Sequence, residues 1–236
     1  MGSDDGTIGR VLTRREALAL LGGCGLAALG AGRPASAAPG TCVVRPALTE
    51  GPYFVDVKLD RSDIRSDPAD GTLRPGVPLH LTLRVSRLAA GACAPLAGAM
   101  VDVWHCDAAG VYSDVTDRGG STVGRKFLRG YQTTGADGLV AFTTIYPGAY
   151  PGRAVHVHFK VRADAGRGRA HEFTSQLFFD DALTDQAHAR PPYAGARRMR
   201  NERDGIYRGT GGQLTLAAAP SGGGYAAAFD LALEVG

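Results

Sequence analysis

Apolar and polar residues alternate along this chain in short runs, and the alternation predicts strands. Between Ala154 and Arg162, apolar side chains occupy every second position, the period-two pattern of a half-buried strand. Similar runs cover residues 79–88, 99–105, 127–133, 139–145, 173–179, 213–218 and 225–235. Glycine-rich turns separate several of these runs, and no helical period exceeds two turns. The pattern predicts an all-β fold, an antiparallel β-sandwich with long loops and little helix.

The longest interval between predicted strands spans residues 180–212 and is polar and rich in turns. We expect a helical turn or two there, packed over one end of the sandwich. The interval also contains a cluster of basic residues, Arg197, Arg198, Arg200 and Arg203. We interpret the cluster as part of a solvated loop and assign it no function.

Residues 1–38 precede the predicted strands and have the pattern of an export signal. Arg14 and Arg15 come before an apolar run at 17–31, and small residues around Ala37 offer a cleavage site. The paired arginines favour a twin-arginine signal, with an ordinary secretory signal as the alternative and lipidation at Cys24 ranked lower. The apolar run is too short and glycine-rich for a good membrane span. We therefore expect an exported protein, extracellular or in the cell envelope, whose residues 39–236 form the β-sandwich domain.

Length and charge limit the function classes further. With 236 residues and 44% hydrophobic content, the chain can bury one sizeable core after a targeting segment. Its formal net charge is only +3, and no basic run is interleaved with aromatic residues. The sequence thus gives no reason to expect a nucleic-acid partner.

Three cysteines remain if Cys24 leaves with the signal, and export permits a disulfide between two of them. Cys42 and Cys93 lie in loop-like contexts with proline and glycine nearby. Cys106 instead follows an apolar strand, as a buried thiol would. We favour a bridge between Cys42 and Cys93, although the sequence leaves all pairings open.

His156 and His158 stand two residues apart on the predicted strand 154–162. Their side chains leave the same face about 6–7 Å apart, which allows both imidazoles to bind one ion. Two tyrosines lie in turns that could complete such a site: Tyr112 follows a strand end, and Tyr150 precedes a proline that favours an extended backbone. The competing interpretations are solvent-facing histidines and interfacial tyrosines with solvated hydroxyls.

A donor set of two imidazoles and two phenols restricts the metal. A phenol ionises near pH ~10, so it binds strongly only to an ion acidic enough to displace its proton. Ferric iron meets that need better than zinc or magnesium, and cupric copper is the next candidate.

Four segments carry a family resemblance: V-D-V-W-H-C-D-A-A-G-V-Y-S-D, F-L-R-G-Y-Q-T-T, P-G-A-Y-P-G-R-A-V-H-V-H-F and T-S-Q-L-F-F. Together they resemble the intradiol ring-cleavage dioxygenases, which include protocatechuate 3,4-dioxygenase and catechol 1,2-dioxygenase. The resemblance runs from residue 49 to about residue 180. It implies one Fe(3+) per chain and cleavage of a catechol by O2 between the hydroxyl-bearing carbons, giving a cis,cis-muconate-type dicarboxylate.

The same resemblance implies the roles of individual residues. Tyr112, Tyr150, His156 and His158 match the iron ligands, and Tyr150 matches the ligand that leaves the metal and takes up a substrate proton. Arg153 matches a cation that stabilises negative charge on the ring, and Gln176 a residue that orients the substrate or a neighbouring side chain. Tyr146 lies in the same turn as Tyr150, but we expect it to serve packing.

Departures from the family pattern leave the substrate open. Only five residues separate Tyr150 from His156, fewer than in family members that cleave catechol or protocatechuate. The chain is more similar to the secreted, shorter branch, and the short loop predicts an open site suited to plant-derived or lignin-related catechols. The alternatives are a secreted ligand-binding module without catalysis and a copper oxidase with the same ligands. The sequence leaves the protein as a monomer or a homodimer.

Overall fold

The computed structural model describes residues 42–117, 119–164, 170–193 and 198–234, within the compact unit Ala38–Gly236. The predicted export signal, with Cys24 and Ala37, lies outside these residues. In the part of the chain that is described, no helix has the length and apolar character needed to cross a membrane.

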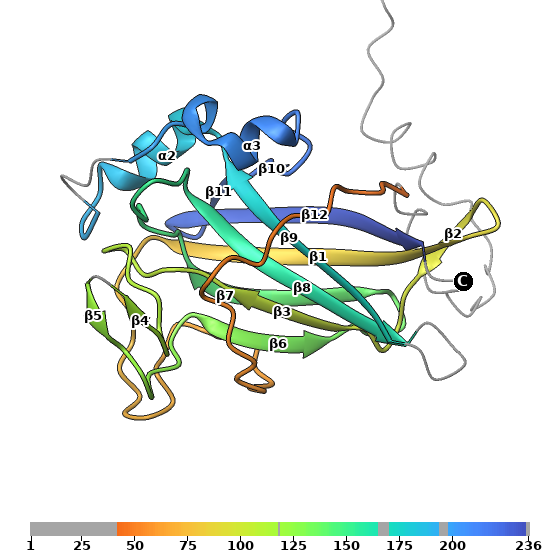
Figure 1. Cartoon of the computed structure of the whole chain (residues 1–236), viewed down its shortest axis with the longest axis horizontal. Helices are drawn as coiled ribbons and strands as arrows, with labels where there is room; N and C mark the ends of the chain where they lie inside the picture. Colours follow the sequence, from red (N-terminus) through yellow and green to blue (C-terminus); the bar gives the residue numbers. More distant parts are fainter. Residues whose placement is uncertain (1–41, 118, 165–169, 194–197, 235–236) are drawn as a thin grey trace, which may run out of the picture. The chain divides into compact units, whose positions relative to one another are not determined.

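The first sheet is built around the long strand β1, Pro78–Ala89 (Figure 1). One edge of β1 pairs in parallel with β12 (Gly224–Glu234), which in turn pairs with β11 (Ala219–Ser221). The other edge pairs with β7 (Leu139–Ile145) and then with the short β2 (Ala92–Pro95), both antiparallel.

The second sheet has the order β10-β9-β8-β3-β6. Its strands are β10 (Thr215–Leu216), β9 (Ala170–Phe179), β8 (His156–Asp164), β3 (Met100–Trp104) and β6 (Arg129–Thr133). Strand β8 pairs antiparallel with β9 on one side and with β3 on the other. A separate hairpin joins β4 (Thr116–Asp117) to β5 (Gly120–Ser121).

The two sheets pack face to face over one apolar core. Alternate residues of β1, including Leu81 and Leu83, are buried in it, as are Val157 and Phe159 of β8. The Phe159 ring approaches the ring of Phe229 on β12 at 6.2 Å between centroids, which links the sheets across the core. The predicted β-sandwich is confirmed. Most of its ladders are antiparallel, whereas β1–β12 and β9–β10 are parallel, because alternation fixes which face is buried but not strand direction.

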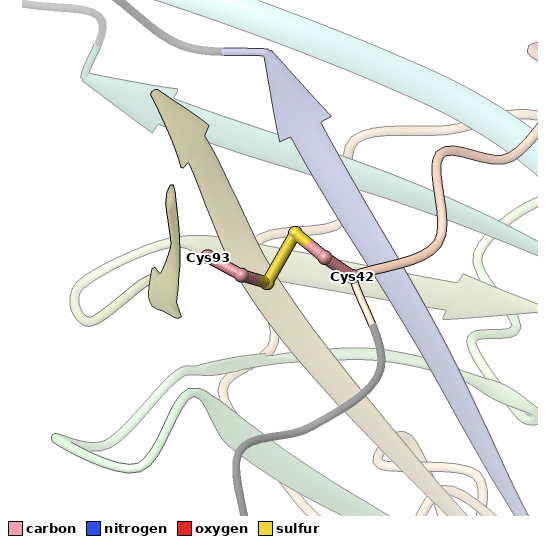
Figure 2. Close-up of a disulfide and its surroundings, with 2 residues drawn as sticks. All are labelled: Cys42 and Cys93. Carbon is pink, nitrogen blue, oxygen red and sulfur yellow. A yellow bond between two sulfur atoms is a disulfide. The ribbon is translucent and has the colours of Figure 1, made fainter. Parts of the chain in front are cut away.

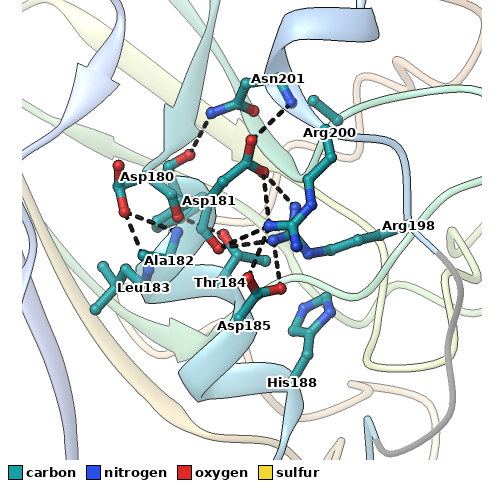
Figure 3. Close-up of polar contacts among 12 residues, drawn as sticks. Asp180, Asp181, Ala182, Leu183, Thr184, Asp185, His188, Arg198, Arg200 and Asn201 are labelled. Carbon is teal, nitrogen blue, oxygen red and sulfur yellow. Dashed lines mark hydrogen bonds and ion pairs between the residues drawn. The ribbon is translucent and has the colours of Figure 1, made fainter.

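The interval after β9 forms α2 (Asp181–His188), the 3-10 turn η1 (Asn201–Arg203) and α3 (Gly205–Gly209), gathered at one end of the sandwich (Figure 1). The interpretation of its arginines as a solvated loop is wrong for Arg198, whose side chain is only 7% exposed. Arg198 pairs with Asp181 and Asp185 of α2, because these carboxylates project toward the returning chain (Figure 3). Arg197 lies outside the described residues.

A disulfide joins Cys42 to Cys93 of β2, with a Cα–Cα distance of 5.7 Å (Figure 2). This is the pairing favoured from the sequence. Cys106 is a buried free thiol. The bridge and the contact of Val44 with Ala232 of β12 fasten the first described residues to the edge of the sandwich.

Candidate metal centre

Strand β8 presents His156 and His158 on the face directed away from the core between the sheets. The expectation that this face is half-exposed is wrong: both histidines are 3% exposed and Lys160 is 7% exposed. The chain around residues 50–54 covers that face. Lys160 Nζ lies 2.7 Å from Glu50 Oε2 and 4.2 Å from the centre of the Phe54 ring. The interpretation of the histidines as solvent-facing is thereby excluded.

A close backbone contact brings the two tyrosine-bearing loops together. Gly148 N–H donates to the carbonyl oxygen of Asp107 at 3.1 Å, and a Cβ at Gly148 would lie only 2.4 Å from that oxygen. Only glycine fits there without displacement, so the turn carrying Tyr150 rests against the loop that leads to Tyr112. Tyr146 points elsewhere: it is fully buried and its hydroxyl lies 2.8 Å from Thr184 Oγ1. Tyr146 therefore serves packing.

The loop before Tyr112 is held by Asp107, whose Oδ1 accepts from Ala109 N–H and Val111 N–H at 2.9 and 3.0 Å. Beyond the tyrosine, buried Arg129 donates from Nε to the Ser113 hydroxyl oxygen at 2.9 Å and from Nη2 to the Ser113 carbonyl oxygen at 2.6 Å. These bonds on both sides fix the backbone of Tyr112. Its ring is 1% exposed.

Three donor atoms converge at the histidines. The two Nε2 atoms of His156 and His158 are 2.9 Å apart, and the Tyr112 hydroxyl lies 3.4 Å from His156 Nε2. His156 Nδ1 donates to the carbonyl oxygen of Ala154 at 2.6 Å. Since a carbonyl can only accept, the neutral ring keeps its lone pair on Nε2, directed into the cluster. Trp104 stacks on His158 at 4.9 Å and holds that ring in place.

This donor set fits a strongly Lewis-acidic cation. Among the described residues no cluster of three or more His, Cys, Asp or Glu exists, so any cation at this site needs the tyrosines. Burial lowers the pKa of His156 to about 4, and burial together with the neighbouring His156 lowers the pKa of His158 well below its usual value, so both imidazoles are neutral and able to coordinate. Burial raises the pKa of the Tyr112 phenol well above its usual value. Only a strongly Lewis-acidic ion displaces such a proton readily, which favours ferric or cupric ions over zinc or magnesium.

Tyr53 belongs to the same cluster, and sequence reasoning missed its part in it. Its ring stacks on Tyr112 at 4.5 Å, and its hydroxyl lies 2.7 Å from the hydroxyl of Tyr150. Burial and the neighbouring Tyr150 raise the pKa of Tyr53. A signal was present in the sequence, because Gly51 and Pro52 predict a turn that would direct the following aromatic residue. Gly51 has a positive φ of 70°, and a Cβ there would approach His158.

Arg153 and Gln176 form a chain of contacts beside the cluster. Arg153 Nη2 donates to Gln176 Oε1 at 2.7 Å, and Gln176 Nε2 donates to the carbonyl oxygen of Thr49 at 2.8 Å. Arg153 lines a cavity of about 260 Å³ together with Tyr53, Tyr112, Tyr150, His156 and His158. Gln176 is fully buried and stands behind Arg153 rather than on the cavity wall.

A larger cavity of about 630 Å³ adjoins the first, and Tyr53, Tyr112, Tyr150 and Pro151 line both. Val111, Val115 and Asp117 line its outer part. The tyrosine cluster therefore has a small cavity on its histidine side and a wider one, with both polar and apolar lining residues, on the other.

Comparison with known proteins assigns the chain to a family. A family model described as a dioxygenase matches residues 49–199. An intradiol ring-cleavage dioxygenase of Tetranychus urticae has 32% identity and a TM-score of 0.71, over 82% of this chain and 95% of that structure. This chain belongs to the intradiol ring-cleavage dioxygenase family.

Two curated family members give a narrower match. The chain is 32% identical to a catechol 1,2-dioxygenase of Acinetobacter lwoffii over 108 residues, which are 37% of this chain and 34% of that protein. It is 30% identical to a chlorocatechol 1,2-dioxygenase of a Pseudomonas species over 154 residues, 58% of this chain and 55% of that protein. The chain thus spans between a third and about half of the length of these relatives.

Proposed function

We propose that the protein is a non-haem Fe(III) dioxygenase that cleaves a catechol-type ring between its hydroxyl-bearing carbons. O2 supplies both oxygen atoms, and the product is a cis,cis-muconate-type dicarboxylate. The observation that carries the proposal is the buried convergence of Tyr112, His156 and His158 beside Tyr150. These four residues would hold the iron, which when bound acts as a Lewis acid that binds the catecholate oxygens and activates the ring toward O2.

The surroundings of the two tyrosines support different roles for them. Tyr112 is buried and fixed on both sides, whereas Tyr150 is partly exposed and hydrogen-bonded to the Tyr53 hydroxyl. Tyr150 therefore accepts the proton of a catechol hydroxyl, and Tyr53 provides a partner for the resulting phenol. Arg153, on the wall of the small cavity, supplies a fixed positive charge for the negative charge that develops on the ring.

The two adjoining cavities support a substituted catechol as substrate. The small cavity of about 260 Å³ suits one ring, and the wider one of about 630 Å³ leaves room for a ring substituent beside Val111 and Val115. We infer a plant-derived or lignin-related catechol, in line with export directed by residues 1–38. Sequencing the N-terminus of protein recovered outside the cytoplasm tests export, and a start close to residue 38 is expected.

The decisive experiment combines metal analysis, visible spectroscopy and an ultraviolet assay of muconate formation on a panel of catechols. We expect about one iron per chain, a red-brown colour from tyrosinate-to-iron charge transfer, and muconate as product. Tyr150→Phe should change the visible band and lower ring cleavage at least about tenfold. Tyr146→Phe, in the same turn but bonded to Thr184, is the matched control and should retain both.

Other outcomes identify the competing functions. Quinone formation by a copper-loaded protein would indicate an oxidase. Catechol binding without any product, by a protein that stays colourless after iron loading in air, would indicate a ligand-binding module. Either result overturns the proposal.

A further inference from the structure

Asp204 joins η1 to α3, and both of its carboxylate oxygens are fully engaged. Its side chain is 1% exposed. Oδ1 accepts from the backbone N–H groups of Ile206 and Tyr207 at 2.8 and 3.2 Å, which caps α3. Oδ2 accepts from Arg153 Nε at 2.8 Å and from Ala154 N–H at 2.8 Å. One carboxylate therefore connects a helix start to the arginine of the candidate site.

These contacts hold the Arg153 guanidinium from two directions. Asp204 binds Nε, and Gln176 binds Nη2, so rotation about the end of the side chain is blocked. The guanidinium has further N–H donors that remain for the cavity it lines. The bond from Ala154 N–H to Asp204 fixes the backbone directly after Arg153, two residues before His156.

The charge of Asp204 is part of this arrangement. Burial opposes ionisation, but hydrogen bonds from Ala154 N–H and Arg153 outweigh it and hold the pKa of Asp204 below its usual value. A charged carboxylate can accept hydrogen bonds on both of its sides. An asparagine has one oxygen and one donor group, so it satisfies either the helix cap or Arg153, but not both.

We propose that Asp204 is a positioning residue for ring cleavage, which aims Arg153 at the substrate and makes the placement of that arginine depend on α3. The inference rests on the proposed function for its catalytic consequence. Its structural part, the immobilisation of the Arg153 side chain by Asp204, is testable without any bound metal.

The test compares Asp204→Asn with Asp180→Asn. Asp180 is the control, because its Oδ1 caps α2 through the N–H groups of Ala182 and Leu183, and both of these hydrogen bonds lie within the first turn of its own helix. Both variants lose a charged helix cap, and Asp204→Asn should lower the melting temperature more than Asp180→Asn, because Asp204 is buried and also bonds Arg153, whereas Asp180 is exposed. Only Asp204→Asn should lower kcat, by about 10- to 100-fold, with KM within about threefold of wild type.

A double-mutant cycle separates positioning from general destabilisation. If Asp204 acts through Arg153, adding Asp204→Asn to Arg153→Lys should lower kcat by less than about twofold more. An Asp204→Asn protein with wild-type kcat, or fully multiplicative losses in the cycle, would overturn the proposal. Asp204→Glu keeps both acceptor sides and should recover part of kcat if the carboxylate is what matters.

A measurement on metal-free protein keeps this test independent of the reaction. The Arg153 Nε–H should give a distinct, slowly exchanging nuclear magnetic resonance signal in wild type and in Asp180→Asn. In Asp204→Asn it should broaden or move to the position of solvent-exposed arginines. Persistence of the wild-type signal refutes positioning by Asp204, whereas absence of ring cleavage in wild type refutes the proposed function alone.

Discussion

At the scale of single residues, Tyr53 and Tyr150 are coupled through their hydroxyls, 2.7 Å apart. The coupling places a hydrogen-bond partner beside the tyrosine that we assign as proton acceptor. The Tyr53 ring also stacks on Tyr112 and so supports a second ligand of the proposed iron. Tyr53 thus contributes to the site by its ring and by its hydroxyl, and the two contributions can be separated.

Tyr53→Phe removes the hydroxyl and keeps the stacked ring. We expect kcat/KM for a catechol to fall about three- to tenfold, because a hydrogen bond of this kind contributes about 1 kcal/mol. The iron content and the melting temperature should stay close to wild type. Tyr207→Phe is the control, since its hydroxyl bonds Thr215 Oγ1 away from the site. Equal activity of Tyr53→Phe and wild type would show that Tyr150 needs no such partner.

Sequence reasoning proposed site residues that stand close together or, like Tyr112, which lies 44 residues before His156, match a family pattern. Tyr112, Tyr150, Arg153, His156 and His158 all line the small cavity. Tyr53 and Asp204 were not predicted, because their partners are 97 and 51 residues away in the chain. Local spacing carries no information about such contacts, which depend on how the loops at the end of the sandwich meet.

At the scale of elements, the positions of the longer strands were predicted well, whereas the ends of the strands and the short strand β2 were predicted less well. The predicted strand 139–145 coincides with β7, and the other predicted runs contain β1, β3, β6, β8, β9, β10 and β12 or differ from them by a few residues at the ends. Strand β2 was missed because Ala92–Pro95 has small residues and a proline in place of an alternating pattern. The burial of both faces of β8 was missed, since the residues covering it come from a distant, irregular segment.

The end of the sandwich near α2 depends on one buried arginine. Arg198 is 7% exposed and bonds Asp181 and Asp185, whereas its neighbour Arg200 is 46% exposed and bonds Asp185 from outside (Figure 3). Arg198→Gln removes the buried partner of Asp181 and one of the two arginines that bond Asp185, and should lower the free energy of unfolding by about 1–2 kcal/mol. Arg200→Gln, the control, should change the free energy of unfolding much less, because its ion pair with Asp185 is exposed to solvent. Denaturant unfolding of both variants measures the difference, and equal losses would contradict a special role for Arg198.

At the scale of the whole molecule, the disulfide closes a long loop. The bridge between Cys42 and Cys93 (Figure 2) spans 51 residues. Between the two cysteines, the segment around Glu50 covers the histidine face of β8 before the chain enters β1. Restricting the unfolded chain over a loop of this length contributes roughly 4 kcal/mol in the chain-entropy model. The same bond therefore stabilises the fold and the segment that covers the histidine face of β8.

We expect the double variant Cys42→Ser/Cys93→Ser to unfold with a free energy about 2–4 kcal/mol lower than wild type. A reductant should destabilise wild type to a similar extent and leave the double variant unaffected, because Cys106 is an unpaired buried thiol. Urea unfolding with and without reductant gives both comparisons. If reductant does not change the wild-type midpoint, the bond does not contribute to stability.

Acid sensitivity is the other property of the whole molecule that the structure predicts. His105 is fully buried between the carbonyl oxygen of Cys106 and the hydroxyl of Thr144, and burial lowers its pKa to about 4. The unfolded chain binds this proton below pH ~6.5, whereas the folded protein binds it only near pH 4. The contribution of neutral His105 to the free energy of unfolding is thus complete above the pKa of His105 in the unfolded chain. It is lost as the pH falls toward the pKa of His105 in the folded protein.

For His105 alone, the free energy of unfolding falls by about 2 kcal/mol between pH ~7.5 and ~5. His156 and His158, which are neutral in the metal-free site, lower it in the same direction. His105→Gln should therefore have a shallower pH dependence of unfolding free energy than wild type in metal-free protein, even if its stability at neutral pH is lower. His80→Gln, on an exposed strand position, should keep the wild-type slope. Urea titrations at several pH values measure these slopes, and an unchanged slope in His105→Gln would mean that the folded protein accommodates the charged imidazole.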